Sequence, residues 1–293
     1  ICKSLPDGVD ISFSVEDGKA TVRAGRSRFT LSTLAAAEFP TVEAGDGEID
    51  LDLAQPLVRQ MIDRTGFAMA QQDVRYYLNG MYLEIKEGRL RFVATDGHRL
   101  ALCTAPGQVV ADDKSVIIPR KGILELSRLL DGDGSVTLSV GSNHIRAATE
   151  QFTFTSKLVD GKFPDYERVL PRSPDKSVSG DRSELRQAFT RTAILSNEKY
   201  RGVRLSLTPG TLEITANNPE QEQAEESVPV DYAGDALEVG FNVSYLLDVM
   251  GVLAGPTVRM SLSDSASSAL IEEGEAGGDM DAEALYVVMP MRL

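Results

Sequence analysis

The residue types best suited to chemistry gather in the stretch ATDGHRLA, which runs from Ala94 to Ala101. Asp96, His98 and Arg99 fall within four consecutive positions, and His98 is one of only two histidines in the 293-residue chain. An aspartate beside a histidine could form a general base, but catalysis also needs an oriented nucleophile or a bound metal. No phosphate-binding loop, nucleophile elbow or HExxH sequence accompanies the cluster. The same residues suit a turn at a strand end, in which Asp96 accepts bonds from the local backbone and Gly97 takes a positive φ.

An internal repeat helps to decide between these interpretations. VRQMIDRT (58–65) resembles LRQAFTRT (185–192), and GRLRFVA (88–94) resembles GTLEITA (210–216) at nearly the same separation along the chain. In the later unit the sequence NNPE, residues 217–220, takes the place of the cluster and contains no histidine. The repeated scaffold therefore does not depend on histidine chemistry, and the turn is the favoured interpretation.

The repeat predicts three domains of unequal completeness. Leu34 and Phe39 match Leu158 and Phe163 at the same separation, which ties the beginning of the chain to its middle. We therefore expect two complete units, residues 48–175 and 176–293, preceded by the last part of an earlier unit, residues 1–47. The period is too long for a solenoid, so each complete unit is expected to have its own core.

Each complete unit combines helices with strands. The earlier unit has an apolar stripe at i, i+3, i+4 and i+7, namely Val58, Met61, Ile62 and Thr65, and the later unit has Leu185, Ala188, Phe189 and Thr192. Second helices are predicted within PRKGILELSRLL (119–130) and NVSYLLDVMGVL (242–253). Runs such as SVTLSV (135–140) and TVRMSL (257–262) predict strands. The fold class is therefore α+β, with two helices in every unit.

The composition is that of an ordinary globular protein. The net charge is −14, hydrophobic residues make up 42% of the chain, and no apolar run approaches the length of a membrane-spanning helix. Cys2 and Cys103 provide neither a disulfide framework nor a metal cluster, which suits a cytoplasmic protein. We expect no cofactor, no metal site and no membrane partner.

Several longer motifs identify a family. They are ATDGHRLA (94–101), QQDVRYYLNG (71–80), FTSKLVDGKFPDY (154–166), LSNEKYRGVRL (195–205) and the terminal YVVMPMRL (286–293). Together they resemble the bacterial DNA polymerase III β subunit, the sliding clamp, and the resemblance spans the whole chain. It implies three similar domains with two inner helices and outer antiparallel sheets each, of which most of the first is missing here. In full-length members two chains form a ring around duplex DNA.

The resemblance also implies that the cluster is not catalytic but lines a pocket for short peptides of partner proteins. One part of the pocket is expected to comprise Leu78, Thr95, Gly97, Arg99, Leu100, Pro164, Arg168 and Val169. The other part is expected to comprise His98, Asn242, Tyr245, Val287, Val288, Met289, Pro290, Met291 and Arg292. Tyr200 and Ala266 belong to the same site but depart from the phenylalanine and valine that are common there, which bears on peptide preference.

A DNA-facing surface is expected on the polar sides of the inner helices. The candidates are Arg59, Arg64, Arg186 and Arg191, with Arg120 and Lys121 at the start of another helix. The family comparison adds Gln72, Arg75, Tyr76 and Tyr77. A ring that slides needs few and non-specific phosphate contacts, so an acidic chain is compatible with this function.

The function predicted from the sequence is thus a non-enzymatic processivity factor. Its partners are duplex DNA, the catalytic subunit of DNA polymerase III, the clamp loader and other proteins with clamp-binding motifs. Full-length members of the family also form homodimers. The alternative is a metal-dependent hydrolase or nuclease that shares the domain. A nuclease would gather several carboxylates around Mg²⁺, and no repeated acidic cluster lies near Asp96.

Overall fold

The computed structural model describes residues 1–39, 49–274 and 282–292. The chain divides into two compact units, Ile1–Ala44 and Gly45–Leu293. The expected boundary between residues 47 and 48 falls outside the described residues. Among the described residues, no helix is long and apolar enough to cross a membrane.

The smaller unit contains one antiparallel sheet. Its strands are β1 (Ile11–Glu16), β2 (Lys19–Ala24) and β3 (Ser27–Ser32), in the order β1-β2-β3, with short 3-10 turns at Cys2–Ser4 and Ala36–Glu38. Val22 and Ala24 are buried, whereas Phe13 and Val15 are exposed.

The larger unit contains the same order of elements twice. The earlier set is β4 (Ile49–Ala54), α1 (Gln55–Thr65), β5 (Gly80–Lys86), β6 (Arg89–Thr95), β7 (Arg99–Thr104), β8 (Lys114–Pro119), α2 (Arg120–Leu129), β9 (Ser135–Val140), β10 (His144–Ala148) and β11 (Thr153–Lys157). The later set is β12 (Lys176–Asp181), α3 (Arg182–Thr192), β13 (Gly202–Thr208), β14 (Thr211–Asn217), β15 (Gln223–Pro229), β16 (Leu237–Asn242), α4 (Val243–Val252), β17 (Thr257–Leu262), β18 (Ala269–Glu273) and β19 (Glu283–Val288). We call these sets the first and second repeat.

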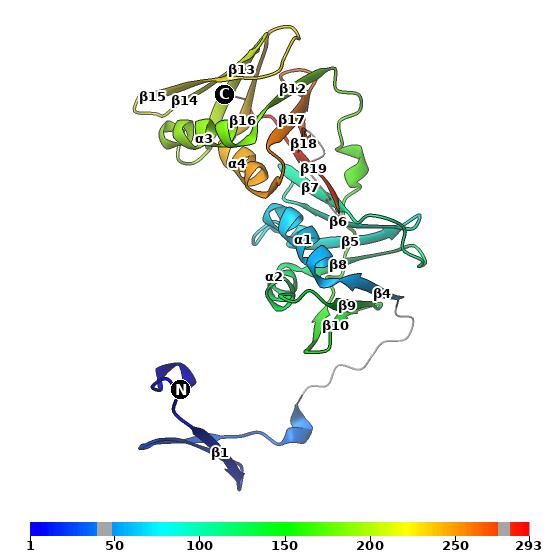
Figure 1. The fold of residues 1–293 in the computed structure, drawn as a ribbon, viewed down its shortest axis with the longest axis vertical. Coiled ribbons are helices and arrows are strands. Elements are labelled where there is room, and N and C mark those ends of the chain that lie inside the picture. Colours follow the sequence, from blue (N-terminus) through cyan, green and yellow to red (C-terminus); the bar gives the residue numbers. More distant parts are fainter. Residues whose placement is uncertain (40–48, 275–281, 293) are drawn as a thin grey trace. The chain divides into compact units, whose positions relative to one another are not determined.

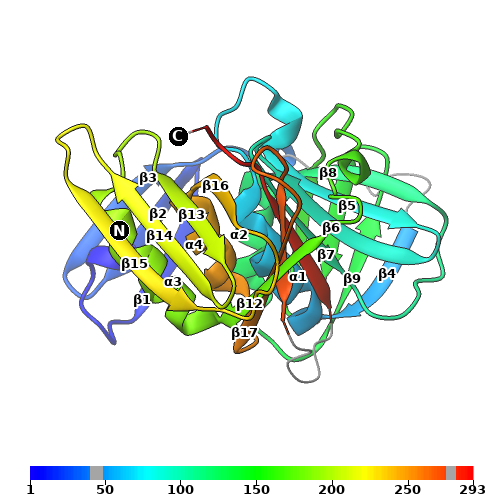
Figure 2. The same cartoon turned by 90° about the horizontal axis from the view of Figure 1, so that it is seen from above.

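One sheet joins the two repeats. Its strand order is β12-β17-β18-β19-β7-β6-β5-β8, and the joint is the antiparallel pair of β19 with β7, in which Val287 lies opposite Leu100. Both views show β19 running beside β7 (Figure 1, Figure 2). Each repeat also has a four-stranded sheet, β11-β10-β9-β4 in the first and β15-β14-β13-β16 in the second.

The helices form where the apolar period predicts them. The two predicted stripes, on α1 and α3, are buried almost completely. Asp181 and Asn242 cap α3 and α4 by accepting bonds from the backbone amides of Glu184 and Ser244. In Figure 1 the four α-helices of the described residues follow one another along one side of the larger unit. The predicted α+β architecture is confirmed.

The joined sheet has a core on each face, and the outer core covers the strands of the first repeat together with β19. The face toward the helices carries the main core, which runs through both repeats without interruption. The opposite face carries a smaller core built from Leu78, Val93, Leu100, Leu102, Ile117 and Val287, covered by Phe163 and Tyr166. In Figure 1 the short 3-10 turn Tyr166–Arg168 (green) lies on this side, away from the helices.

Candidate functional site

The cluster Asp96–Arg99 forms a turn between β6 and β7. Asp96 Oδ1 accepts the backbone amides of His98 at 2.9 Å and Arg99 at 3.0 Å, and Gly97 has a φ of 90°. The turn interpretation is therefore confirmed. The exposed His98 ring stacks near Tyr245, with ring centroids 6.4 Å apart, and no hydrogen bond joins it to a carboxylate within the described residues.

A cavity opens beside this turn at the junction of the two repeats. Its volume is about 180 Å³. The predicted residues that line it are Leu78, Thr95, Gly97, Arg99, Leu100, Pro164, Val169, Val287 and Met289. They come from the 3-10 turn Tyr76–Leu78, from β6, β7 and β19, and from the segment that covers the outer face of the sheet. Segments far apart in the sequence are thus brought together because β19 pairs with β7.

Two residues of the cavity were not predicted as part of it. Tyr166 ends one of the family motifs but was not assigned to the pocket, and Arg75 was assigned to DNA. Arg75 is held by Asp73, with Nη2 at 2.9 Å from Oδ2, and it donates to the carbonyl oxygen of Asp96 at 3.0 Å. The hydrogen bonds from the Arg75 side chain and backbone lower the pKa of Asp73 to about 2. Arg75 therefore supplies a fixed cation at the rim of an otherwise apolar cavity.

Arg99 connects the pocket to the second repeat. Its guanidinium bonds to Asp96 Oδ2 at 3.1 Å, to the carbonyl oxygen of Phe67 at 2.9 Å and to the carboxylate of Asp248 on α4. The same group lies 4.5 Å from the ring centroid of Tyr245. A planar cation that binds carboxylates and stacks on aromatic rings is the role to which arginine is better suited than lysine.

The other predicted half of the pocket continues along the start of α4 and the end of the chain. Tyr245 lies in the first turn of α4, three residues after the cap Asn242. The backbone amide of Met289 donates to the carbonyl oxygen of His98 at 2.9 Å, and that of Met291 donates to Gly240 at 2.9 Å. The terminal segment is therefore held across the junction, with Met289 partly exposed.

The remaining residues that were predicted to belong to the pocket do not line the cavity. Tyr200, Ala266, Pro290 and Arg292 do not line the cavity, and exposed Arg168 pairs with Asp165 at 2.8 Å. The assignment of Val288 needs correction. Its side chain is fully buried in the main core on the opposite face of the sheet, because neighbouring residues of a strand point to opposite faces.

The predicted DNA-facing residues also divide into groups. Arg59, Lys121 and Arg186 are exposed on the helices, and neither Lys121 nor Arg186 makes an ion pair with another described residue. Arg191 is exposed but pairs with Glu226 at 2.6 Å, and half-buried Arg120 donates to the carbonyl oxygen of Met69 at 3.3 Å. In the loop before β5, Gln72 and Tyr76 are exposed and Tyr77 is half-buried, with the two tyrosine rings 5.8 Å apart.

The assignment of Arg64 to the DNA-facing surface is wrong. Its exposed fraction is 4%, and Nη1 donates to the carbonyl oxygen of Ala282, 2.7 Å away, in the second repeat. Arg64 therefore serves the junction between the repeats. The apolar period of α1 did not indicate this, because the contact comes from a segment more than 200 residues further along the chain.

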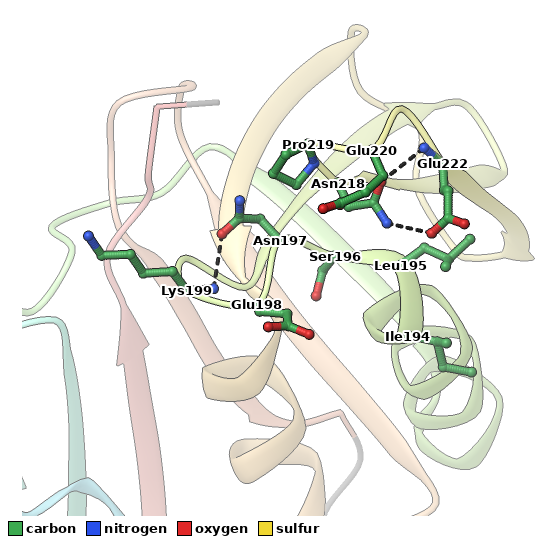
Figure 3. A pocket seen from close by; sticks show the side chains of 10 residues that line it. All are labelled: Ile194, Leu195, Ser196, Asn197, Glu198, Lys199, Asn218, Pro219, Glu220 and Glu222. Atoms are coloured by element: carbon green, nitrogen blue, oxygen red, sulfur yellow. Dashed lines mark hydrogen bonds between the residues drawn. The ribbon is translucent and has the colours of Figure 1, made fainter.

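A second, more polar cavity of about 450 Å³ lies in the second repeat. Figure 3 shows its two sides, the loop 194–199 and the hairpin residues 218–222. Asn218 and Glu222 close the hairpin with two hydrogen bonds of 2.7 and 2.9 Å. Glu198, Glu220 and Glu222 outnumber Lys199 on this rim, which is therefore mainly acidic. Ile194, which also lines the cavity, has an exposed fraction of 74%.

No group of three or more metal-binding side chains occurs within the described residues. Cys103 is buried in β7, and burial raises the pKa of its thiol to about 12, so it is not a reactive nucleophile.

Comparisons with known proteins identify the family to which this fold belongs. Models of the DNA polymerase III beta subunit match residues 1–43 (N-terminal domain), 52–165 (central domain) and 167–292 (C-terminal domain). The chain belongs to the DNA polymerase III beta subunit family.

Individual relatives are similar along the whole chain. The beta sliding clamp of Pseudomonas aeruginosa is 64% identical over 295 residues, and that of Escherichia coli K12 is 53% identical over 294 residues. In both cases the match covers 100% of this chain and 79% of the relative. A crystal structure of the Pseudomonas aeruginosa DNA polymerase sliding clamp with ligand has a TM-score of 0.93 at 64% identity, covering 100% of this chain and 79% of that one. A Pseudomonas aeruginosa sliding clamp bound to griselimycin has a TM-score of 0.92 at 64% identity, covering 100% and 78%.

Proposed function

We propose that this protein is a non-enzymatic processivity clamp of the cytoplasm, which encircles duplex DNA and holds polymerase and other partners through a peptide pocket. The domains that carry this function are residues 48–175 and 176–293, with residues 1–47 as part of a preceding domain. The observation that carries the proposal is the cavity at the junction of the repeats. The names of the relatives support a clamp and give no support to the hydrolase or nuclease alternative.

The cavity is suited to a short peptide with large apolar side chains. Leu78, Leu100 and Val287 form apolar walls, and Met289 is a flexible wall that can adapt to more than one ligand. Arg75 and Arg99 add polar groups at the rim that can orient a backbone or a glutamine side chain. We expect the catalytic subunit of polymerase III, the clamp loader and other partners to carry peptides of this kind and to bind the pocket one at a time.

The first prediction tests the pocket by calorimetry. A synthetic peptide in which a glutamine precedes leucine and phenylalanine should bind with micromolar affinity, because two anchors contribute roughly 2 kcal/mol each against the ordering of the peptide. Removing residues 289–293 should abolish binding, since the adaptable wall is lost. His98→Ala should weaken binding only a few-fold, because His98 shapes the rim without doing chemistry.

The control is Arg128→Ala, which keeps the terminal segment and removes one exposed side chain of α2 outside the predicted pocket. It should bind like the parent. Unchanged affinity after removal of residues 289–293 would contradict the pocket assignment. Cleavage of DNA by the parent with Mg²⁺, lost in His98→Ala, would revive the enzymatic alternative.

DNA is expected to be retained by enclosure more than by affinity. The net charge of −14 and the few unpaired cations on the helices favour weak, sequence-independent contacts with phosphates.

The repeat also supports a way to close the ring with a second copy. In the larger unit the last strand of one repeat, β19, adds to the edge strand β7 of the other. β3 holds the same place in the sheet β1-β2-β3 as β19 holds in the series β17-β18-β19. We therefore expect β3 to pair with the edge strand β15 of another chain. Exposed Arg26 and Arg28 in and beside β3 complement the acidic rim next to β15, and Ile194 offers an apolar contact.

A further inference from the structure

Residues 158–170, which we call the covering segment, cross the outer face of the joined sheet. The segment packs Phe163 and Tyr166 onto an apolar row formed by β5, β6, β7, β8 and β19. The cavity lies between this segment and the sheet, since Pro164, Tyr166 and Val169 form one wall and Leu100 and Val287 form another. The position of the segment over the sheet therefore sets the width of the cavity.

Apolar packing alone leaves that position loosely defined. Phe163 stacks on Tyr82 of β5, with ring centroids 4.6 Å apart and planes 8° apart. Stacked rings and aliphatic contacts are attractive over a range of offsets, because burial is not directional. A segment held only in this way could slide along the sheet by a fraction of a residue.

The backbone amide of Val159 donates to the carbonyl oxygen of Ile117 at 2.8 Å, which fixes the start of the covering segment. Further along, at the cavity wall, a polar network around Tyr166 supplies the direction. Glu84 of β5 and Arg91 of β6 lie opposite each other in the strand pair. The Tyr166 hydroxyl donates to Glu84 Oε2 at 2.5 Å, and Arg91 Nη1 bonds to the same oxygen at 3.1 Å and to the Tyr166 oxygen at 3.2 Å. Glu84 and Tyr166 are only 8% and 4% exposed, so the bond between them is shielded from water, whereas Arg91 is half-buried.

The protonation of Tyr166 keeps this network intact. Burial, followed by the hydrogen bond to Glu84, raises the pKa of the Tyr166 phenol well above its usual range. The hydroxyl therefore remains a donor throughout the neutral pH range. Glu167, the next residue, pairs with Lys86 at 3.1 Å at the exposed edge, where an ion pair contributes little.

We propose that Glu84 and Arg91 are positioning residues for peptide binding, which act by fixing the Tyr166 hydroxyl and with it the wall of the pocket. The inference rests on the proposed peptide pocket. Neither carboxylate nor guanidinium needs to touch the peptide. They hold the ring of Tyr166, Pro164 and Val169 at one distance from β7 and β19, so the pocket is formed before a ligand arrives, which favours affinity.

The test compares Tyr166→Phe and Glu84→Gln with the parent. The probe is the fluorescent form of the synthetic peptide with a glutamine before leucine and phenylalanine, measured by anisotropy and stopped flow. Tyr166→Phe keeps the ring and removes the bond, so we expect about tenfold weaker binding, chiefly through faster dissociation. Glu84→Gln keeps an acceptor oxygen but replaces the charged carboxylate with a neutral amide, so we expect a smaller loss in the same direction. The double variant should be no weaker than the weaker single variant, because both act through one bond.

Tyr232→Phe is the matched control. Tyr232 is also 4% exposed and donates its hydroxyl to the carbonyl oxygen of Asp235 in a part-buried bond. It lies in the second repeat and does not line the cavity. It should lose stability to a similar extent and keep peptide affinity within about twofold. Hydrogen exchange adds a local readout, since the amide of Val169, bonded to the Tyr166 carbonyl at 3.0 Å, should exchange faster in Tyr166→Phe only.

The outcomes separate this inference from the proposed function. If the folded parent does not bind the peptide, the pocket proposal fails and the inference fails with it. If the parent binds and both Tyr166→Phe and Glu84→Gln bind equally well, the inference alone is overturned. Equal losses in Tyr166→Phe and Tyr232→Phe would also overturn it, because the effect would then follow stability and not position.

Discussion

Individual side chains at the pocket serve two purposes at once. Arg99 lines the cavity and also reaches Asp248 in the second repeat, and Arg75 lines it while bonding to the carbonyl oxygen of Asp96. Their charges are thus already engaged by protein groups before any ligand arrives. A cation that is held in place costs little entropy when it orients a ligand. The fixed rim explains how a small apolar cavity can still be selective.

Gly97 allows this arrangement, and its replacement is the next prediction. A Cβ at Gly97 would lie 2.9 Å from Arg75 Nη1, and the φ of 90° is strained for any other residue. Gly97→Ala should therefore displace Arg75 and weaken peptide binding several-fold, in addition to a backbone cost of about 1–2 kcal/mol. Calorimetry with the peptide and thermal unfolding measure the two effects.

Gly210→Ala is the control for strain alone. Gly210 has a φ of 79° with no atom near its Cβ position, so the variant should lose stability and keep peptide affinity.

Lowering the pH should not weaken peptide binding in the way that Gly97→Ala does. Because the pKa of Asp73 is depressed, its pairing with Arg75 is complete above the ordinary carboxyl pKa of about 3.9. It is lost only as the pH falls through about 2. Equal affinities of the two glycine variants would contradict the displacement of Arg75.

At the scale of elements, the apolar period located the helices but not every side chain on them. The stripes of α1 and α3 are buried as predicted, because a core-facing helix must present one apolar face. Arg64 was placed on the polar face of α1, yet it lies beneath a carbonyl group of the other repeat. The spacing of apolar residues predicts which face of a helix is buried. It does not predict which side chains at the edge of that face are covered by a segment far away in the sequence.

The pocket shows the same division. ATDGHRLA and VVMPMRL could be assigned to one site through the family resemblance, and most of the cavity follows those residues. Tyr166 was missed because its role depends on the register that sets Glu84 opposite Arg91. Only the pairing of β5 with β6 reveals that the two charges share a partner. The tyrosine two positions after Pro164 was the one available signal, and alone it indicates no contact.

The helix faces give a prediction that separates DNA contact from packing. Replacing Arg59, Lys121 and Arg186 with alanine should leave thermal stability nearly unchanged and should weaken binding to linear duplex DNA at low salt. The slope of log affinity against log salt should fall by about 2 to 3, since each lost phosphate contact removes nearly one counterion. Arg64→Ala, on the same helix as Arg59, should act in the opposite way. It should lower the free energy of unfolding by about 1–3 kcal/mol, because the carbonyl oxygen of Ala282 loses a buried donor, with little effect on the salt slope.

If the triple variant has the same salt slope as the parent, DNA contacts another surface of the protein.

At the scale of the whole molecule, one rule of strand addition explains both the junction inside the chain and the expected contact between chains. The last strand of the second repeat completes a sheet of the first, and the main core continues across the joint. In the described residues the edge of β15 has no such partner. An open edge beside an exposed isoleucine favours association and is a liability when it remains uncovered.

The final prediction tests association through this edge. Ile194 is 74% exposed at the second cavity, whose rim is mainly acidic (Figure 3). β3 and its hairpin carry Arg26 and Arg28 on the surface of the smaller unit. Ile194→Asp places a charge where an apolar contact is expected and adds to the negative rim, so it should raise the dissociation constant of self-association at least about tenfold. Arg28→Glu should have a similar effect from the other partner, and both effects should shrink at high salt, because complementary charges at an interface are screened.

Val110→Asp is the control, since Val110 is fully exposed but lies on a loop of the first repeat. Sedimentation velocity over a micromolar concentration series measures all four proteins. Self-association that is equal in the parent and in Ile194→Asp, or lost equally in Val110→Asp, would show that copies of the chain do not meet at this edge.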